Sequence, residues 1–246
     1  MNKEEQYKKQ LCYFGDEFSH TNKYKLNSWQ KSYIERINKY LLGYSHKGKV
    51  LIDIATGSGY VAVEMAKLGL NVIATDLTPE VIENLKRYKR QLGLENLTLK
   101  KCFAEKIPLP DNSVDYVVAN AILEHIPDEM QAVKEWKRIL KLGGKMFITV
   151  PLKYQYILPF LWLPNYIHDK RIGHLRRYDL KTLKYKFKLP VVKVFYSGHL
   201  VKILGIILGM ILRTDKYDEY FEKKDKKYQN NIYGGNNISV VLKNEK

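Results

Sequence analysis

Asp53, Gly57 and Gly59 lie close together in the sequence, and their types and spacing suit the binding of a small charged ligand. Glycines let a ligand approach the backbone without a Cβ in the way. The apolar pattern of residues 60–68 predicts a helix directly after them. The N-terminus of that helix and the free N–H groups of the turn can bind polar ligand atoms. The segment therefore predicts a ligand-binding turn at the end of a strand.

Asp53 decides between two cofactor classes that use such a turn. Residues 57–62 satisfy G-x-G-x-x-G/A, a dinucleotide fingerprint that is unspecific by itself. A carboxylate at the start of the turn repels a pyrophosphate, whereas it attracts a cationic amino-acid group. S-adenosylmethionine (SAM) carries an ammonium and a sulfonium group. We therefore predict that the turn binds SAM rather than NAD.

Asp76 is a second carboxylate at the end of an apolar run. At this place in the chain it can accept hydrogen bonds from both ribose hydroxyls of a bound nucleoside. It could also act only as an acid near the helix N-terminus that Pro79 predicts. Both interpretations stay open, and the position of Asp76 does not separate SAM from NAD.

Alternating strand and helix patterns surround these residues and would position them. Alternation of this kind predicts a parallel sheet with helices on both faces. The predicted strands cover residues 50–54, 71–75, 97–102, 114–119, 145–150, 191–196 and 237–242. The predicted helices include residues 60–68, 79–92, 128–140 and 180–187, and residues 142–144 are predicted to stop the third of these before the fifth strand.

Several segments resemble the class I SAM-dependent methyltransferases. Residues 53–59 resemble motif I of that family, D/E-x-G-x-G-x-G, with Ala55 in place of the first glycine. Residues 102–115 resemble its segment G-D-A-E-x-L-P-F-x-D-x-S-F-D, with Phe103 where the family has aspartate. Residues 118–127 are similar to its V-x-x-x-x-L-E-H-I/V-x-D. As a set, these motifs look most like the small-molecule group that includes the ubiquinone and menaquinone methyltransferases.

The resemblance covers roughly residues 48–150 and implies an α/β fold. This fold has a seven-stranded, mostly parallel Rossmann-like sheet with helices on both faces and an antiparallel last strand. Residues 1–48 are expected to form an N-terminal helical cap, which either closes over the cofactor or packs on the sheet edge. Residues 49–246 are expected to form the SAM-dependent methyltransferase domain. It would carry insertions at about residues 151–178 and 197–231, after the cofactor half, where this fold places acceptor specificity.

The resemblance also implies which residues bind SAM. Phe103 would stack on the adenine or pack beside it, because the aspartate of the family motif is missing, and the backbone N–H of Ala104 would serve a ring nitrogen. Asn120 and Ala121 would lie beside the methyl donor. Together, the predicted cofactor-binding residues are Asp53, Ala55, Thr56, Gly57, Gly59, Asp76, Leu77, Phe103, Ala104, Asn120 and Ala121.

The acceptor side is predicted from two further segments. His125 is a candidate catalytic base or active-site wall, with a structural histidine under the loop as the alternative. Residues 173–178 resemble the family's G-H-x-R-x-F/Y segment. The predicted substrate residues of this segment are His174, Arg176, Arg177 and Tyr178. The two arginines suit a carboxylate or phosphate on the acceptor, unless Arg177 pairs with Asp179 or caps a helix end.

The implied reaction is in-line transfer of the SAM methyl group to an O, N or C atom of a small-molecule acceptor, which could be lipid-like or anionic. An oxygen acceptor would need a base, with His125, His168 and His174 as candidates. No metal is expected, because SAM itself carries the reactive group. Three other classes stay open: a nucleic-acid or protein methyltransferase, a SAM-binding protein without catalysis, and an NAD-dependent oxidoreductase.

Composition narrows the partners and the location. The chain has 246 residues, a formal net charge of +16 and 45% hydrophobic residues, enough for a sizeable core. Most of the positive charge comes from scattered lysines, and the chain has no N/D-P-P-Y motif or appended basic domain, so a nucleic-acid partner is disfavoured. Two cysteines form neither a disulfide framework nor a zinc spacing, and the first residues lack an apolar signal segment. A reducing, cytoplasmic location is therefore expected.

Two apolar stretches fall in the predicted insertions. Residues 154–167 are rich in aromatic side chains, and residues 201–212 are apolar apart from Lys202. The second stretch is shorter than the roughly 20 residues that span a bilayer, so a buried helix, an oligomer contact and an interfacial helix all stay open. Lysines lie among both stretches, which favours docking at an anionic membrane surface with a lipid-linked acceptor. The alternative is that the stretches pack on each other as a lid.

Overall fold

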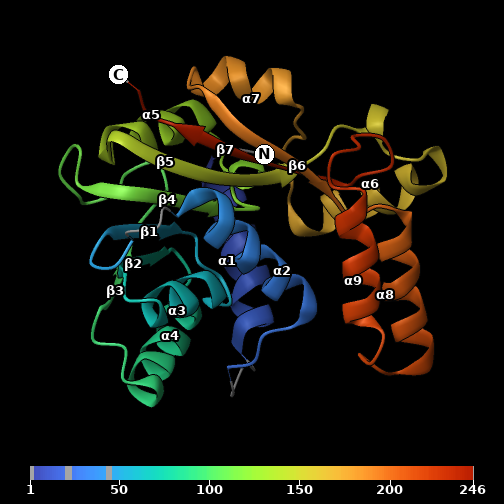
Figure 1. Ribbon diagram of the computed structural model, residues 1–246, viewed down its shortest axis with the longest axis horizontal. Helices are drawn as coiled ribbons and strands as arrows, with labels where there is room; N and C mark the ends of the chain where they lie inside the picture. The colour runs from blue at the N-terminus through green and yellow to red at the C-terminus, as the bar shows by residue number, and fades with distance from the viewer. Residues whose placement is uncertain (1–2, 20–23, 43–45, 246) are drawn as a thin grey trace.

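A computed structural model describes residues 3–19, 24–42 and 46–245, and a seven-stranded sheet runs through them (Figure 1). The strands are β1 (Val50–Ile54), β2 (Asn71–Asp76), β3 (Leu97–Lys101), β4 (Val114–Asn120), β5 (Leu140–Pro151), β6 (Val191–Ser197) and β7 (Asn237–Lys243). Their order is β3-β2-β1-β4-β5-β7-β6, with β1 to β5 parallel and β7 antiparallel to both neighbours. The predicted mostly parallel α/β fold with an antiparallel last strand is confirmed.

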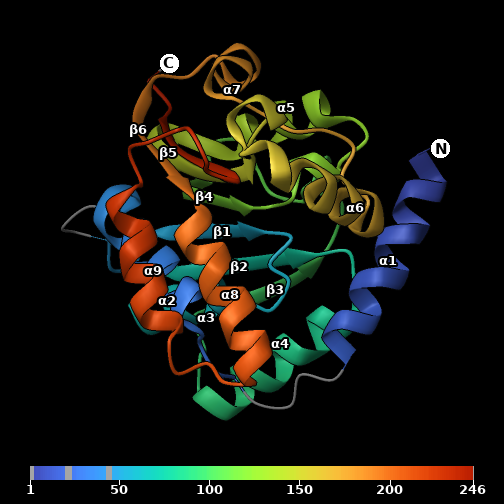
Figure 2. The same cartoon turned by 90° about the vertical axis from the view of Figure 1, so that its right-hand side faces the viewer.

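Helices pack on both faces of this sheet (Figures 1 and 2). The helices of the described residues are α1 (Lys3–Ser19), α2 (Ser28–Arg36), α3 (Tyr60–Lys67), α4 (Pro79–Leu92), α5 (Glu129–Ile139), α6 (Trp162–Ile172), α7 (Leu180–Phe187), α8 (Leu200–Leu212) and α9 (Asp218–Lys227). Short helical turns are η1 (Ile37–Leu41), η2 (Leu123–His125), η3 (Tyr154–Tyr156) and η4 (Pro159–Leu161). The predicted helices 60–68, 79–92, 128–140 and 180–187 correspond to α3, α4, α5 and α7.

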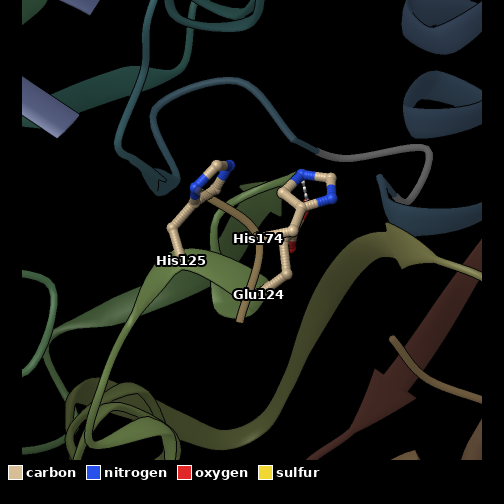
Figure 3. A group of neighbouring side chains, drawn as sticks. All are labelled: Glu124, His125 and His174. Atoms are coloured by element: carbon tan, nitrogen blue, oxygen red, sulfur yellow. Dashed lines mark ion pairs between the residues drawn. The ribbon is translucent and has the colours of Figure 1, made fainter. Parts of the chain in front are cut away.

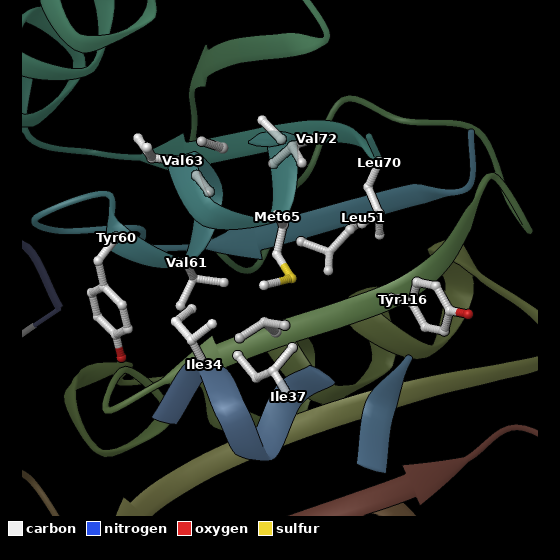
Figure 4. Packing of buried hydrophobic residues seen from close by; sticks show 14 of the residues in the cluster. Ile34, Ile37, Leu51, Tyr60, Val61, Val63, Met65, Leu70, Val72 and Tyr116 are labelled. Atoms are coloured by element: carbon white, nitrogen blue, oxygen red, sulfur yellow. The ribbon is translucent and has the colours of Figure 1, made fainter. Parts of the chain in front are cut away.

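The side chains of β1 point alternately to the two faces of the sheet, and they join a separate core cluster on each face. Leu51 packs with α2, η1 and α3, as Figure 4 shows for Ile34 and Met65. Ile52 and Ile54 join the opposite cluster with α5 and α7. Successive strand side chains point to opposite faces, so a strand that is buried on both sides is apolar throughout. Asp53 interrupts this apolar run, and it lies at the edge where the site forms.

One local prediction is wrong, because residues 142–144 do not form a helix stop outside the sheet. Helix α5 ends at Ile139, and the chain enters β5 at Leu140. The pairing of β5 with β4 shifts register between Val114 and Tyr116, so residues 142–144 form an irregular part of the strand. A Cβ at Gly144 would lie 2.9 Å from a backbone oxygen of the facing strand, which explains why this irregular stretch contains glycine.

Helices α8 and α9 stand out from the sheet as a pair (Figure 1). Gly205 is the only residue of α8 that is buried, and a Cβ there would lie 2.4 Å from the ring of Phe221 in α9. The interpretation of residues 201–212 as a buried core helix is therefore excluded. Within the described parts of the chain, the structure contains no helix with both the length and the apolarity needed to cross a bilayer.

Candidate active site

A cavity of about 480 Å³ opens at the carboxyl ends of β1, β2 and β4. The order of the strands reverses between β1 and β4, and open α/β sheets bind ligands outside the strand ends at such a point. Helix α1 covers the cavity from outside, through side chains that include Tyr7, Gln10 and Phe14. The cavity is thus bounded by the sheet edge on one side and by the N-terminal helix on the other.

The turn after β1 has the backbone that its glycines predict. Gly57 and Gly59 both have positive φ angles, of 54° and 75°. A Cβ at Gly59 would lie 2.3 Å from Leu85 in α4, so this glycine is required for the close approach of the two segments. Ala55 also has a positive φ, of 51°, at the position where the resembled motif has glycine. An alanine in this conformation carries backbone strain on the order of 1–3 kcal/mol, and the surrounding contacts must offset it.

Two buried carboxylates flank this turn. Oδ2 of Asp53 accepts a hydrogen bond from the hydroxyl of Thr56 at 2.5 Å, and burial raises the pKa of Asp53 to about 7. Asp76 accepts from the backbone N–H of Gly57 at 3.1 Å and from that of Thr78 at 2.9 Å. Burial also raises the pKa of Asp76. A cationic group that binds here would favour the ionised form of both acids.

Most of the predicted cofactor residues come together at the cavity. The lining residues among them are Asp53, Ala55, Thr56, Gly57, Asp76, Leu77, Phe103, Ala104, Asn120 and Ala121. Gly59 is the exception, because it faces Leu85 behind the turn and acts through the backbone conformation. The exposed ring of Phe103 meets Tyr7 of α1 edge to face, with ring centroids 5.1 Å apart. An aromatic pair therefore stands at the place where the resembled motif has aspartate.

Helix α1 supplies the site residues that sequence reasoning did not name. Gln6 donates to the carbonyl of Gly173 at 2.7 Å, and Gln10 donates to the carbonyl of His125 at 2.7 Å. Tyr7 donates to the buried carboxylate of Glu105. These contacts bind α1 to the body of the protein over the cavity, while α2 packs on the sheet through Tyr33 and Ile34. The described part of residues 1–48 therefore places α1 over the cavity and α2 on one face of the sheet.

The end of β4 lies next to the turn. The side chain of Asn120 donates to the hydroxyl of Tyr60 at 2.7 Å, and Ala121 has a positive φ of 52°. The backbone N–H of Ala121 donates to Thr149 in β5. Asn120 and Ala121 therefore have a fixed backbone at the cavity wall, and their place beside the methyl donor stays a prediction.

His125 lines the cavity and belongs to a buried cluster with Glu124 and His174 (Figure 3). Burial lowers the pKa of His125 to about 3, so its imidazole is neutral. Burial raises the pKa of Glu124 to about 8. Nε2 of His174 lies 3.6 Å from Oε1 of Glu124, and Nδ1 of His174 lies 2.8 Å from Asp169. A histidine with such a low pKa is a poor base, so the structure gives His125 the position but not the basicity that a catalytic base needs.

Of the four predicted substrate residues, His174 belongs to this cluster, and none of the four lines the cavity. Arg177 makes a two-pronged contact with Asp169, at 2.6 and 2.8 Å. Arg176 donates to the carbonyls of Ile126 and Pro127, and Tyr178 donates to Glu129. These contacts favour a structural role for the segment. The suggested pairing of Arg177 with Asp179 is wrong, because Asp179 pairs with Lys153 and caps α7 at Thr182.

The comparisons with known proteins agree with this geometry. A family described as "Methyltransferase domain" matches residues 52–148, which include the turn, both carboxylates and His125. The ubiquinone/menaquinone biosynthesis C-methyltransferase of Rickettsia akari is 36% identical over 124 residues, 48% of this chain and 47% of its own length. The demethylmenaquinone methyltransferase of Chlorobaculum tepidum is 34% identical over 127 residues, 51% of this chain and 50% of its own.

Residues 52–148 form a methyltransferase domain. The chain spans about half the length of the curated relatives it matches. SAM is the cofactor of this methyltransferase domain.

Solved structures show the same fold over nearly the whole chain. Geranyl diphosphate C-methyltransferase from Streptomyces coelicolor superposes with a TM-score of 0.68 at 13% identity, covering 97% of this chain and 98% of the other. A phosphoethanolamine N-methyltransferase from Haemonchus contortus, in complex with SAM, gives 0.66 at 18% identity, covering 98% of this chain and 58% of the other. The methyltransferase fold therefore extends beyond the matched domain to the insertions.

Proposed function

We propose that this protein transfers the methyl group of SAM to a small, apolar organic acceptor. The observation that carries the proposal is the pair of buried carboxylates, Asp53 and Asp76, on the two sides of one glycine turn in the cavity. One carboxylate suits the ammonium group of SAM, and the other suits its ribose hydroxyls. The protein would contribute mainly by holding donor and acceptor in line, because SAM carries the reactive group.

The rest of the cavity supports an apolar acceptor. Beyond the carboxylates and the turn, its wall includes the apolar side chains Leu11, Phe14, Trp29, Ile122 and Ile126 beside polar and acidic ones such as Gln10, Glu17 and Glu105. The apolar side chains suit a hydrocarbon or aromatic ring, and the acidic ones oppose an anion. The two arginines that were predicted to bind an anionic acceptor already donate to groups of the protein, so an anion is the less favoured acceptor.

Isothermal titration calorimetry with SAM, S-adenosylhomocysteine and NAD tests the cofactor part of this proposal. We expect SAM and S-adenosylhomocysteine to bind and NAD to give no heat. Transfer from SAM with a labelled methyl group into the lipid fraction of a cell extract then tests catalysis. Binding without any transfer would favour the SAM-binding protein without catalysis, and NAD binding without SAM would favour the oxidoreductase.

The surface beside the site gives a reason to expect a membrane-borne acceptor. Helix α8 exposes Ile207, Met210 and Ile211, the last two to more than 70%. The segment of η4 and α6 exposes Phe160 and Leu163 to more than 60%. Both helices lie on the face that is turned toward the viewer in Figure 2. Apolar side chains gathered in this way are typical of a surface that is covered by another apolar phase or molecule.

Charge favours an anionic membrane over a second copy of the chain as the covering partner. The net charge of +16 repels another copy and attracts anionic lipid, roughly 1 kcal/mol for each basic residue near the surface. Lys170 and Arg171 in α6 and Arg213 after α8 are exposed next to the apolar side chains. Lys202 contributes less, because it pairs with Glu222 at 2.7 Å. We therefore propose that α6 and α8 dock at an anionic lipid surface and that the acceptor is taken from it.

Co-sedimentation with vesicles that contain anionic lipid tests the docking. We expect binding that weakens with salt and with the substitution Ile207→Glu. Leu142→Glu is the matched control, because Leu142 is 67% exposed at the far end of β5 and should bind vesicles like the parent. Protein that stays in the supernatant at low salt would refute docking at a membrane. A dimer in sedimentation velocity that the substitution Ile207→Glu dissociates would instead make a second copy of the chain the covering partner.

A further inference from the structure

Three side chains from two distant segments of the sequence meet beside the cavity, which His125 lines. Glu124 and His125 are neighbours on the turn η2, and His174 comes from the loop after α6 (Figure 3). One ligand atom of each residue lies within 4.8 Å of the others. The group has two imidazoles and one carboxylate, the set of donors that zinc and some other transition metals use.

The carboxylate of Glu124 is buried without a hydrogen bond from another described residue. Glu124 is fully buried, and neither of its oxygens accepts a hydrogen bond from another residue within the described ranges. Nδ1 of His125 is also buried, and it has no hydrogen-bond partner among the described residues. Buried polar groups are nearly always hydrogen-bonded or bound to an ion, so each exception requires an explanation. Three such atoms on adjacent residues point to a missing ligand between them.

His174 is held in the orientation that a metal ligand needs. Its Nδ1 lies 2.8 Å from Oδ1 of Asp169, which directs Nε2 toward Glu124 at 3.6 Å. Asp169 is itself fixed by Arg177 and Tyr154. In metal sites a ligating histidine usually passes its other N–H to a carboxylate in this way, and that partner fixes the ring and its tautomer.

The distances between the three ligand atoms would suit a metal ion if the side chains moved slightly closer together. A tetrahedral zinc ion with bonds of about 2.0–2.1 Å holds its ligand atoms roughly 3.4 Å apart. The 3.6 Å between His174 and Glu124 is already close to that value, so mainly the ring of His125 has to approach. Magnesium and calcium are less suited, because they prefer shells of oxygen atoms.

We propose that Glu124, His125 and His174 bind a zinc ion, and that a hydroxyl oxygen of the acceptor completes its coordination from the cavity. His125 lines the cavity together with Ala121 and Ile122, so the open position of the ion faces the space left for the acceptor. Zinc lowers the pKa of an oxygen bound to it, so an acceptor hydroxyl held there would release its proton to solvent. The oxygen would then bond to the methyl carbon of SAM while the bond from sulfur to that carbon breaks, and S-adenosylhomocysteine would leave with the bonding pair. The zinc site rests on its own geometry, whereas the role of the hydroxyl rests on the proposed methyl transfer.

Metal binding to the whole chain is the first test. The protein is treated with a chelator, and then zinc is titrated in competition with a chromophoric chelator. We expect about one ion per chain, and we expect Co²⁺ in its place to give the strong visible absorption of a four-coordinate site. The absence of stoichiometric zinc binding would overturn the proposal, as would a Co²⁺ spectrum of a purely hydrated ion.

Matched variants locate the site. Glu124→Gln and His174→Ala should abolish the Co²⁺ spectrum, and Asp169→Asn should weaken zinc binding roughly 10–100-fold. His168→Ala is the control, because its ring lies 6.2 Å from that of His174 but is not one of the three ligands. It should bind zinc like the parent. Equal zinc binding by all variants that keep the parent circular dichroism spectrum would place the ion elsewhere and refute the site.

Calorimetry with SAM, on metal-free and zinc-loaded protein, separates the two proposals. SAM binding without any zinc binding would keep the methyltransferase and remove the zinc site. Zinc binding without SAM binding would keep the site and remove the proposed methyl transfer. If both bind, a hydroxyl-bearing aromatic compound such as a catechol should shift the Co²⁺ spectrum of the parent, and an unchanged spectrum would refute the role given to the acceptor oxygen.

Discussion

The hydroxyl of Thr56 donates to Oδ2 of Asp53 across 2.5 Å, at the carboxyl end of β1 where the glycine turn begins. This bond fixes the orientation of Asp53 while the rest of the carboxylate stays available to a ligand. Because burial raises the pKa of Asp53 to about 7, its charge changes near neutral pH. The affinity for a cationic cofactor should therefore depend on pH.

The affinity for SAM should rise between about pH 6 and pH 8 and then level off. Below the pKa, Asp53 is protonated and offers no negative charge to the ammonium group of SAM, whereas above it the charge is present. Asp53→Asn should remove this pH dependence and weaken binding at pH 8 by about 1.5–3 kcal/mol, the range for a hydrogen bond to a charged group. Calorimetry at three pH values measures it. Glu95→Gln, an exposed acid away from the cavity, should behave like the parent.

Without cofactor, the same group should destabilise the protein as the pH rises. Its pKa is 3.8 in the unfolded reference and about 7 in the folded protein, so the folded state holds the proton more tightly. The resulting stability is complete below about pH 4 and is lost as the pH rises through 7. The variant Asp53→Asn has no carboxyl group at this position and should not lose this stability. Its free energy of unfolding, relative to that of the parent, should therefore increase by on the order of 1–3 kcal/mol between pH 5 and pH 8. Urea unfolding of both proteins at pH 5 and pH 8 measures these free energies. The same difference between variant and parent at both pH values would contradict the prediction.

Asp76→Ala should weaken SAM binding by about 1–3 kcal/mol, because the ribose hydroxyls lose an acceptor. The substitution also leaves the N–H groups of Gly57 and Thr78 without their acceptor, so the turn itself should loosen. Asp76→Asn keeps an oxygen acceptor and separates the two effects. If both variants bind SAM like the parent while remaining folded, Asp76 is not part of the site.

Arg177→Lys should lower stability by about 2–4 kcal/mol, because a lysine cannot reproduce the two-pronged contact with buried Asp169. The same change in Arg171, an exposed residue of α6, should have little effect. Thermal unfolding compares the two variants. A large loss of SAM affinity without a loss of stability would instead place Arg177 in the cofactor site.

Gly205→Ala should loosen the pair of helices α8 and α9. The added Cβ would lie 2.4 Å from the ring of Phe221, and such overpacking costs about 1–3 kcal/mol. Proteolysis in the connection between the helices, residues 213–217, should become faster. The double variant Gly205→Ala with Phe221→Leu should recover part of the loss, and additive effects of the two changes would contradict direct contact.

The sequence by itself determined the cofactor half of the molecule. Asp53, the two glycines after it and Asp76 are specified by local requirements, since a buried strand must be apolar and a left-handed turn requires glycine. The strand and helix boundaries followed from periodicity for the same reason. Only the irregular start of β5 was misassigned, because a glycine pair can stop a helix or accommodate a shift in strand register, and only the neighbouring strand decides which.

The tertiary structure alone decided which distant side chains share an environment. Nothing local in the sequence brings Gln10 of α1 to the carbonyl of His125, or aims His174 at Glu124, since those segments meet only when the chain packs. The same holds for α8, whose apolar composition is equally compatible with a core helix and an exposed one. Burial depends on what lies opposite a helix face, and that is a property of the folded chain rather than of any segment of it.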